Sequence, residues 1–145
     1  MNFNVKIIIL NWNGGEVLLD CLKSVSAIDY DNFEIIVIDN GSTDQSIKSI
    51  HDNFPEIEVI ALNENYGYAK AHNKAFDLIG YKDDVFFMLL NNDTIVDKNI
   101  LSHFTGHYQK IGACNSSKPS ILIPTIYYIE TMKPWCISGK VNLKH

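Results

Sequence analysis

The chain has 145 residues, of which 46% are hydrophobic and 20% are charged, and its formal net charge is −5 at pH 7. This length and composition predict one globular domain with a buried core over residues 1–145. The acidic balance and the lack of any basic run argue against nucleic-acid binding through a positive surface.

The cysteines and apolar segments indicate the compartment in which the chain works. Cys21, Cys114 and Cys136 are far apart and form no CxxC pair, which predicts reduced thiols and neither a disulfide framework nor a zinc site. No apolar run approaches the ~20 residues of a membrane-spanning helix, and the first residues lack the basic region of a signal peptide. We therefore expect a cytoplasmic protein, with peripheral attachment to the inner face of a membrane as an open alternative.

The first 90 residues alternate between two hydrophobic patterns. Short apolar runs predict strands at residues 5–10, 33–38, 57–62 and 85–90. Apolar residues at three- and four-residue spacing predict helices around 17–25 and over 67–79. They also predict a helix between these two, which begins at residues 42–44, whose side chains can cap its N-terminus, and ends at Pro55. Strands that alternate with helices in this way form a mostly parallel sheet with helices on its faces, so the chain is predicted to be an α/β protein.

The remaining residues have a less regular pattern. We expect a helix over 97–111, a polar loop over 112–120 and a further strand over 121–129, although Pro124 interrupts it. Residues 135–139 predict a short edge strand or a turn, and we see no closing element in 140–145.

The most informative stretch is the end of the predicted strand 85–90, where Asn91, Asn92 and Asp93 follow directly. A six-residue apolar run predicts a strand buried on both faces. Polar groups after it should stand at the carboxyl edge of the sheet, where open α/β sheets bind ligands. Asp93 is therefore predicted to be a metal or phosphate-site residue, and the alternative is an ordinary turn and helix-cap aspartate.

The predicted strand 33–38 ends in a similar way, on Asp39. A carboxylate there can accept a hydrogen bond from a ribose hydroxyl or a base N–H, which contributes about 1.5–3 kcal/mol. Turn chemistry within residues 39–42 is the alternative explanation. For Asp44 we favour a structural role, because carboxylates in the first turn of a helix bind its free amides.

Other segments offer groups for a ligand that has a base and phosphates. Trp12 follows the first predicted strand and either stacks on a base or belongs to the core. In the segment 63–69, Gly67 permits close backbone approach and the following helix N-terminus suits a diphosphate. This segment lacks the glycine patterns of dinucleotide and P-loop sites. His72 is either a phosphate ligand or, as is more common for a lone helical histidine, a packing or surface residue.

Four blocks carry a resemblance through their order and spacing. They are residues 5–14, 33–44, 65–69 and 91–94. In these blocks the chain resembles the family 2 glycosyltransferases of the GT-A fold, and it looks closest to the rhamnosyltransferase-like branch. The resemblance covers residues 5–97 well and 121–142 more loosely. It implies a Rossmann-like GT-A sheet that is incomplete at its C-terminal end, truncated before the acceptor and catalytic-base segment.

The resemblance implies an inverting transfer of a sugar from a UDP- or dTDP-sugar to a glycan or lipid-linked acceptor in polysaccharide synthesis. It also implies a divalent cation, Mg²⁺ or Mn²⁺, at the DxD motif of the family, which is Asn91-Asn92-Asp93 here. The implied metal ligands are Asp93 and Asn91, with one carboxylate fewer than in the family motif.

The same resemblance implies a set of donor-binding residues. Trp12 takes the place of the aromatic beside the base, Asp39 that of the acidic residue contacting base and ribose, and Asn92 addresses the ribose or the sugar. The full implied set is Trp12, Asn13, Asp39, Asn65, Gly67 and Asn92. His72 stands where many members have an arginine that faces the phosphates.

No catalytic residue is assigned in this chain. In the family the base comes from a segment well after the DxD block, and Glu130 does not fill that role on sequence grounds. The alternative function is therefore a noncatalytic nucleotide-sugar-binding module or an inactive remnant. A sugar-nucleotide pyrophosphorylase is a further alternative, but its glycine-rich basic loop after the first strand is absent.

Overall fold

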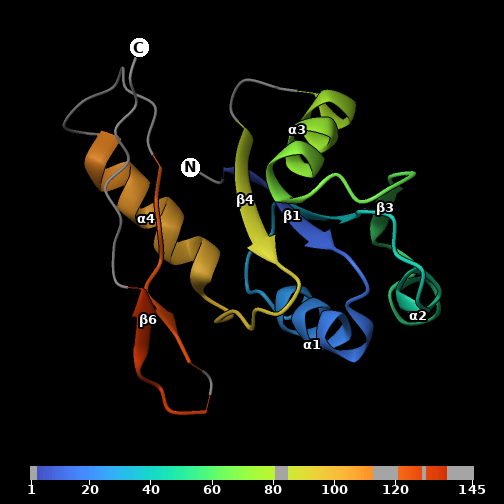
Figure 1. Cartoon of the computed structure of the whole chain (residues 1–145). Helices are drawn as coiled ribbons and strands as arrows, with labels where there is room; N and C mark the ends of the chain where they lie inside the picture. The colour runs from blue at the N-terminus through green and yellow to red at the C-terminus, as the bar shows by residue number, and fades with distance from the viewer. Residues whose placement is uncertain (1–2, 81–84, 113–120, 129, 137–145) are drawn as a thin grey trace. The chain divides into compact units, whose positions relative to one another are not determined.

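The computed structural model describes residues 3–80, 85–112, 121–128 and 130–136 (Figure 1). Contacts divide the chain into two compact units, residues 1–105 and 106–145. The expectation of a single domain over the whole chain stays a prediction. None of the helices in the described ranges is long and apolar enough to cross a membrane.

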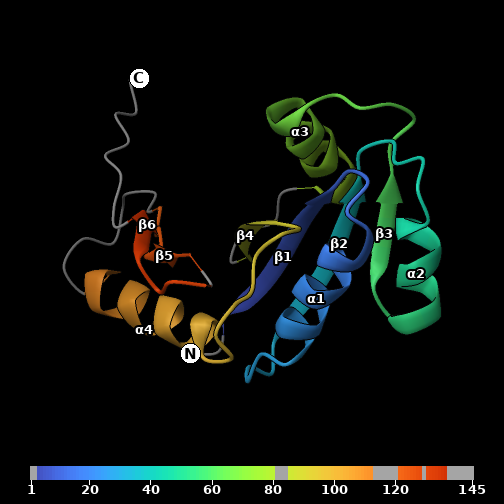
Figure 2. The same cartoon turned by 60° about the horizontal axis from the view of Figure 1, so that its bottom comes forward.

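The first unit contains a parallel sheet. Its strands are β1 (Asn4–Asn11), β2 (Phe33–Asp39), β3 (Glu58–Ala61) and β4 (Val85–Asn91). They lie in the order β3-β2-β1-β4, and every neighbouring pair is parallel, as Figure 2 shows for β1, β2 and β3. The connecting helices are α1 (Gly15–Ser26), α2 (Ser46–Asn53) and α3 (Tyr68–Ile79). The predicted α/β architecture is confirmed.

Alternate residues of β1 enter two different cores. Ile7 and Ile9 pack with Leu22 of α1, in the core that also holds residues of α2, whereas Ile8 packs with Ala75 of α3. Helices α1 and α2 therefore cover one face of the sheet and α3 covers the other (Figure 1). Each fully buried aliphatic side chain of this kind contributes about 1.5–3 kcal/mol. The sheet is thus a rigid support for the loops at its edges.

Register places the polar strand ends side by side. Asn11 pairs with Asp39 in the β1–β2 ladder, and Asn91 pairs with Leu10 in the β1–β4 ladder. Strands β1, β2 and β4 each end one residue later than predicted, on the polar residue itself. The polar groups are therefore held by the sheet and do not belong to flexible turns.

Helix α2 begins later than the sequence suggests. Its N-cap residue is Gln45, and no side chain makes the capping hydrogen bond, so the predicted caps at 42–44 are wrong in the strict sense. The physical reason is competition, because the Ser42 hydroxyl accepts hydrogen bonds from Asn11 and Asn13 instead. Asp44 still accepts a hydrogen bond from the first helical amide, that of Ser46, at 3.0 Å.

The expected strand over residues 121–129 is mostly wrong. Within the described residues 121–128, only β5 (Ile126–Tyr127) forms, and it pairs antiparallel with β6 (Pro134–Cys136). Pro124 has no N–H to donate to a ladder, which explains why the strand does not extend toward residue 121. The predicted helix after β4 is α4 (Ile100–Gly112). Most of the predicted loop 112–120, with Cys114, and residues 137–145 lie outside the described residues.

Candidate functional site

A chain of hydrogen bonds centred on Asn11 holds the carboxyl edge of the sheet. Asn11 is the last residue of the central strand β1 and is fully buried. Its Nδ2 donates to Asp39 Oδ1 at 2.9 Å, and its Oδ1 accepts from Asn92 Nδ2 at 2.9 Å. Side chains as well as the ladder therefore join the end of β2, the end of β1 and the residue after β4.

Asp39 is the innermost carboxylate of this edge, with 1% of its surface exposed. Its Oδ2 accepts from the Ser42 N–H at 2.9 Å, while Asn11 occupies Oδ1. Both oxygens thus have a donor inside the protein, which differs from the open position that the sequence suggests. The contact of Asp39 with a base or ribose stays a prediction.

Asn13 ties the loop after β1 to the loop after β2. It has a left-handed backbone (φ 51°), which asparagine tolerates better than most residues. Its Oδ1 accepts from the amides of Thr43 and Asp44 at 2.8 and 3.3 Å, and its own amide donates to Ser42 Oγ at 2.8 Å. The side-chain oxygen of this predicted donor-binding residue is therefore engaged within the protein.

Asp44 has the structural role that we favoured. Its carboxylate accepts from the amides of Gly15 and Ser46 and from the Ser46 hydroxyl. Partial burial acts to raise the pKa of Asp44, but these hydrogen bonds together outweigh it and hold the pKa below its ordinary value. The carboxylate thereby connects the starts of α1 and α2.

Asn40 and Asn65 connect the second and third loops of the edge. Asn40 Nδ2 donates to Asn65 Oδ1 at 2.9 Å, and Asn40 Oδ1 accepts from the Tyr66 amide at 2.9 Å. The same Asn65 oxygen accepts from the Gly67 amide at 2.8 Å. Asn65 therefore organises the approach to α3, as well as being a predicted ligand residue.

Helix α3 begins at an uncapped N-terminus. Gly67 is its N-cap with φ 73°, a conformation that glycine adopts without strain, and no side chain caps the helix. The first turn contains no acidic residue, so no protein carboxylate competes for its free amides. Such an end suits an anionic group, as the sequence predicts for Gly67.

Two glycines allow the loops to come this close. A Cβ on Gly14 would lie 2.3 Å from Asn11 Oδ1 and 2.5 Å from Asn92 Nδ2. A Cβ on Gly41, which has φ 75°, would lie 2.7 Å from the backbone carbonyl carbon of Glu64. The polar edge therefore depends on the absence of side chains at both positions.

Six of the eight predicted site residues are exposed, and three of them, Trp12, Asn91 and Asp93, offer different chemistry to a ligand. Trp12 is 56% exposed, so it belongs to the surface and not to the core. Asn91 and Asp93 are exposed as well. The edge thus offers an aromatic surface, an amide and a carboxylate to a ligand.

Cys21 lies beneath the segment after β4. Its Sγ is 3.6 Å from the Asn91 carbonyl oxygen. Burial, opposed by a hydrogen bond with the Thr94 backbone and assisted by the charge of Asp93, raises the pKa of Cys21 to about 11. The thiol is therefore protonated at neutral pH and is no nucleophile.

His72 is a buried residue of α3 with 3% of its surface exposed. Its Nδ1 lies 2.9 Å from the Tyr68 carbonyl oxygen, and its ring contacts the Tyr68 ring with centroids 4.4 Å apart. A carbonyl only accepts, so Nδ1 carries the proton and Nε2 is a buried acceptor without a partner among the described residues. This burial favours the packing role over an open phosphate contact.

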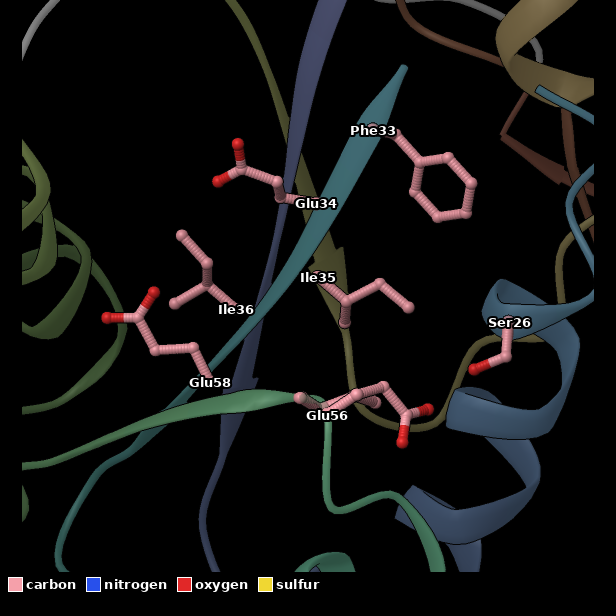
Figure 3. A pocket seen from close by; sticks show the side chains of 8 residues that line it. Ser26, Phe33, Glu34, Ile35, Ile36, Glu56 and Glu58 are labelled. Carbon is pink, nitrogen blue, oxygen red and sulfur yellow. The ribbon is translucent and has the colours of Figure 1, made fainter. Parts of the chain in front are cut away.

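A pocket of about 430 Å³ lies at the opposite, amino edge of β2 and β3 (Figure 3). Its lining includes Ser26, Phe33, Glu34, Ile35, Glu56 and Glu58. Glu34 accepts an ion-pair contact from Lys6 Nζ at 2.8 Å, and the other two glutamates have no ion pair among the described residues. Carboxylates around an apolar floor repel phosphates, so this pocket has the wrong chemistry for the predicted ligand.

Sequence comparison relates most of the chain to one family. Residues 6–129 match the sequence model described as Glycosyl transferase family 2. A poly-beta-1,6-N-acetyl-D-glucosamine synthase of Staphylococcus aureus is 33% identical over 149 residues, which cover 90% of this chain and 35% of the relative. A teichoic acid poly(glycerol phosphate) polymerase of Staphylococcus epidermidis is 35% identical over 91 residues, which cover 60% of this chain and 12% of the relative. The chain thus spans only a part of these relatives.

Solved structures agree with this relation at the level of fold. S. aureus TarS 1–349 matches with a TM-score of 0.64 at 21% identity, covering 74% of this chain and 32% of that one. The same protein in complex with UDP-GlcNAc matches with 0.63 at 22% identity, with 74% and 31% covered. The mannosyltransferase PcManGT of Pyrobaculum calidifontis, in complex with GDP-Man and Mn²⁺, matches with 0.59 at 19% identity, with 70% and 31% covered. The predicted GT-A fold is confirmed.

Sequence reasoning missed the residues that hold the edge together. Turn and cap patterns predict only local roles for Asn11, Asn40 and Ser42, yet the two asparagines are buried and all three carry the hydrogen bonds between loops. The available signal was a polar residue at the end of an apolar strand, because the last residues of a central strand are still buried.

Proposed function

The chain belongs to glycosyl transferase family 2, and from this premise we propose that it forms the donor-binding part of an inverting glycosyltransferase. The donor is a UDP-sugar, and the acceptor is a glycan or a lipid-linked glycan in polysaccharide synthesis. One observation carries the proposal: Asn11, Asp39 and Asn92 join three strand ends at one edge, beside the exposed Trp12 and Asp93.

The nucleoside end of the donor is assigned to Trp12 and Asp39. Stacking of a base on an exposed aromatic ring contributes ~1–3 kcal/mol in nucleic-acid sites. Asp39 accepts from the base or ribose through lone pairs that Asn11 and Ser42 leave unused, which requires the loop 40–45 to open. The TarS structure with UDP-GlcNAc supports uridine nucleotides as the first ligands to test.

The diphosphate end is assigned to the residues after β4 and to the start of α3. The free amides of the first turn, after Gly67, would face the anionic diphosphate, and the helix dipole favours it by about 0.3–1 kcal/mol. These groups hold and orient the leaving group. Donors aimed at the charge that develops there stabilise the transition state more than the ground state.

Residues 91–93, at the end of β4, fit a divalent cation whose coordination shell is completed by substrate phosphates. Asp93 supplies one exposed carboxylate, and Asn91 and Asn92 supply amide oxygens. Mg²⁺ commonly uses one or two protein carboxylates together with phosphate oxygens and water. Within the described ranges no group of three acidic, histidine or cysteine side chains forms a protein-only cage. A cation held by Asp93 and Asn91 would neutralise charge on the diphosphate.

Titration of UDP and UDP-GlcNAc by calorimetry, with Mn²⁺ or with EDTA, tests donor binding. We expect Mn²⁺ to tighten UDP binding and Asp93→Asn to remove this gain, with a loss of about 10–100-fold. Asp52→Asn, an equal change on an exposed position of α2, should bind as the wild type does. Equal Mn²⁺-dependent affinity in Asp93→Asn and wild type would refute the metal assignment.

Catalysis is tested separately from binding. The acceptor hydroxyl needs a carboxylate base on the opposite face of the sugar, and we assign no described residue to that role. Release of UDP from UDP-GlcNAc, with and without glycan acceptors, should therefore be slow in the 145-residue chain. Tight donor binding with no transfer by any longer form of the protein would support the noncatalytic alternative.

A further inference from the structure

We infer that Asn11 is a positioning residue that sets which atom of Asn92 faces a bound ligand, namely the amide oxygen. The identity of that ligand rests on the proposed function. The direction of the hydrogen bonds does not, and it can be tested without a ligand.

The direction is set at Asp39. A carboxylate only accepts hydrogen bonds, so Asn11 must turn its Nδ2 toward Asp39 Oδ1. The second hydrogen of the same Nδ2 points to Ser42 Oγ, at 3.1 Å. Both donors of Asn11 are then in use, and its Oδ1 is left to face Asn92.

Burial makes this direction hard to reverse. Asn11 is 0% exposed and Asp39 is 1% exposed, so water cannot replace a lost partner. Turning the Asn11 amide over would place two acceptors against each other in a site of low dielectric, which is strongly disfavoured. Gly14 leaves the space for the Asn11–Asn92 bond, because a Cβ there would lie within 2.5 Å of both bonded atoms.

The consequence appears at Asn92. One hydrogen of its Nδ2 must go to Asn11 Oδ1, which turns its own Oδ1 away from Asn11, and no hydrogen bond to this oxygen is present among the described residues. Asn92 is half-buried, next to the exposed Asp93. An amide oxygen accepts from a hydroxyl or binds a divalent cation, and it repels a phosphate oxygen. The oxygen at position 92 should therefore contact a ribose or sugar hydroxyl or the cation.

The inference is tested by variants that place a carboxylate at position 92 and remove the one at position 39. In Asn92→Asp the new carboxylate faces Asn11 Oδ1, and because both groups only accept hydrogen bonds, they repel each other. The melting temperature of this variant should therefore fall below that of the wild type. Asn91→Asp adds the same charge one residue away on an exposed side chain and should melt as the wild type does. These two variants form a matched pair.

The double variant Asp39→Asn with Asn92→Asp should regain most of the lost melting temperature. The new amide at position 39 donates to Asn11 Oδ1, Asn11 Nδ2 turns to the new carboxylate at position 92, and the Ser42 amide still finds an oxygen at position 39. Asp39→Asn alone should stay stable, because its oxygen still accepts from the Ser42 amide while its nitrogen donates to Asn11 Oδ1, and the amides of Asn11 and Asn92 turn over to match.

UDP binding adds a measurement that a purely structural role would not change. In the double variant the carboxylate faces the ligand, so in EDTA UDP should bind about five- to tenfold more weakly than to Asp39→Asn alone, the effect of one like charge at short range. Mn²⁺ should restore this loss. Unchanged affinity in EDTA would overturn the assignment of position 92 to the ligand.

The two proposals fail in different ways. A wild-type chain that binds no UDP refutes the proposed function, while the melting temperatures still decide the direction of the hydrogen bonds. The inference is overturned if the melting temperature of Asn92→Asp equals that of the wild type. It is also overturned if the double variant has a melting temperature no higher than that of Asn92→Asp. Should Asp39→Asn unfold the chain, the comparison of Asn92→Asp with Asn91→Asp decides alone.

Discussion

The two edges of the parallel sheet differ in how they use their polar side chains. At the amino edge, Glu34, Glu56 and Glu58 belong to the lining of an open pocket, with Glu34 and Glu58 on one side of the strands and Glu56 on the other (Figure 3). Of these three, only Glu34 has an ion-pair partner among the described residues. At the carboxyl edge the polar side chains are amides and carboxylates that bind one another, as Asn11 does with Asp39 and Asn92.

This difference shows that the pocket and the groups suited to a nucleotide ligand lie at different edges of the sheet. The amino edge has volume, but its pocket is lined by three carboxylates, of which only Glu34 is paired with a cation among the described residues, and this disfavours phosphates. The carboxyl edge presents free helix amides, an aromatic ring and one carboxylate on loops whose positions are fixed by hydrogen bonds. Apart from Asp39, which becomes accessible only when the loop 40–45 opens, these polar groups are preorganised and bind a charged ligand with little reordering. The carboxyl edge is therefore the better candidate site.

Gly14→Ala should give the largest change, because it disrupts the bonds of the carboxyl edge. The backbone of Gly14 (φ −78°, ψ −18°) suits alanine, so the effect comes from the Cβ pressing on Asn11 and Asn92. We expect a loss of about 1–3 kcal/mol in the free energy of unfolding, measured with urea. Gly106→Ala in α4, where a Cβ meets nothing, should instead stabilise the chain by about 0.5–1 kcal/mol. A Gly14→Ala chain as stable as the wild type would break the account of this edge.

Trp12→Ala should weaken UDP binding without changing the fold. Because the side chain is 56% exposed, we expect roughly 1 kcal/mol, the low end of the range for base stacking. Tyr128→Ala, at an equally exposed aromatic, is the control. Quenching of tryptophan fluorescence by UDP should also disappear in Trp12→Phe. Quenching that persists would place the base elsewhere.

Asp44→Asn should produce a smaller effect that depends on pH. The folded pKa of Asp44 lies below its ordinary value of 3.8, so its contribution is complete above that value and is lost as pH falls through the folded pKa. The variant should therefore be less stable than the wild type at pH 7, by less than about 1 kcal/mol for this exposed carboxylate. The two melting temperatures should converge as the pH falls below the folded pKa of Asp44. A constant difference across this range would exclude the charge as its cause.

Changes at the amino edge should have the smallest effect on the ligand. Glu56→Gln with Glu58→Gln removes two carboxylates from the pocket without touching the carboxyl edge. UDP affinity should change by less than about twofold at physiological salt, because the charges are screened over the length of a strand. A large gain in affinity would mean that phosphates bind at this edge.

The sheet could be predicted because its hydrophobic pattern repeats locally. The runs that form β1, β2 and β4 and the helical spacing of α1 and α3 each carry their own signal, and all of these elements formed where expected. The strand expected over residues 121–129 had the same kind of apolar run, but Pro124 removed a ladder donor and only Ile126–Tyr127 formed.

The position of the candidate site could be predicted from the sequence, but the hydrogen bonds between its loops could not. Residues that end strands, such as Asp39 and Asp93, follow from the sequence because strand order and carboxyl edge follow from the α/β pattern. The burial of Asn11 and the sharing of Asn65 depend on contacts between loops that are far apart in the sequence. Local patterns carry no information about such contacts.

The most direct test of the account is to map UDP on the chain by amide chemical shifts in the presence of Mg²⁺. The account predicts that the shifts concentrate at the carboxyl edge, in residues 11–15, 39–44, 65–69 and 91–94. Shifts confined to Phe33, Glu34 and residues 56–58 at the amino edge would contradict it.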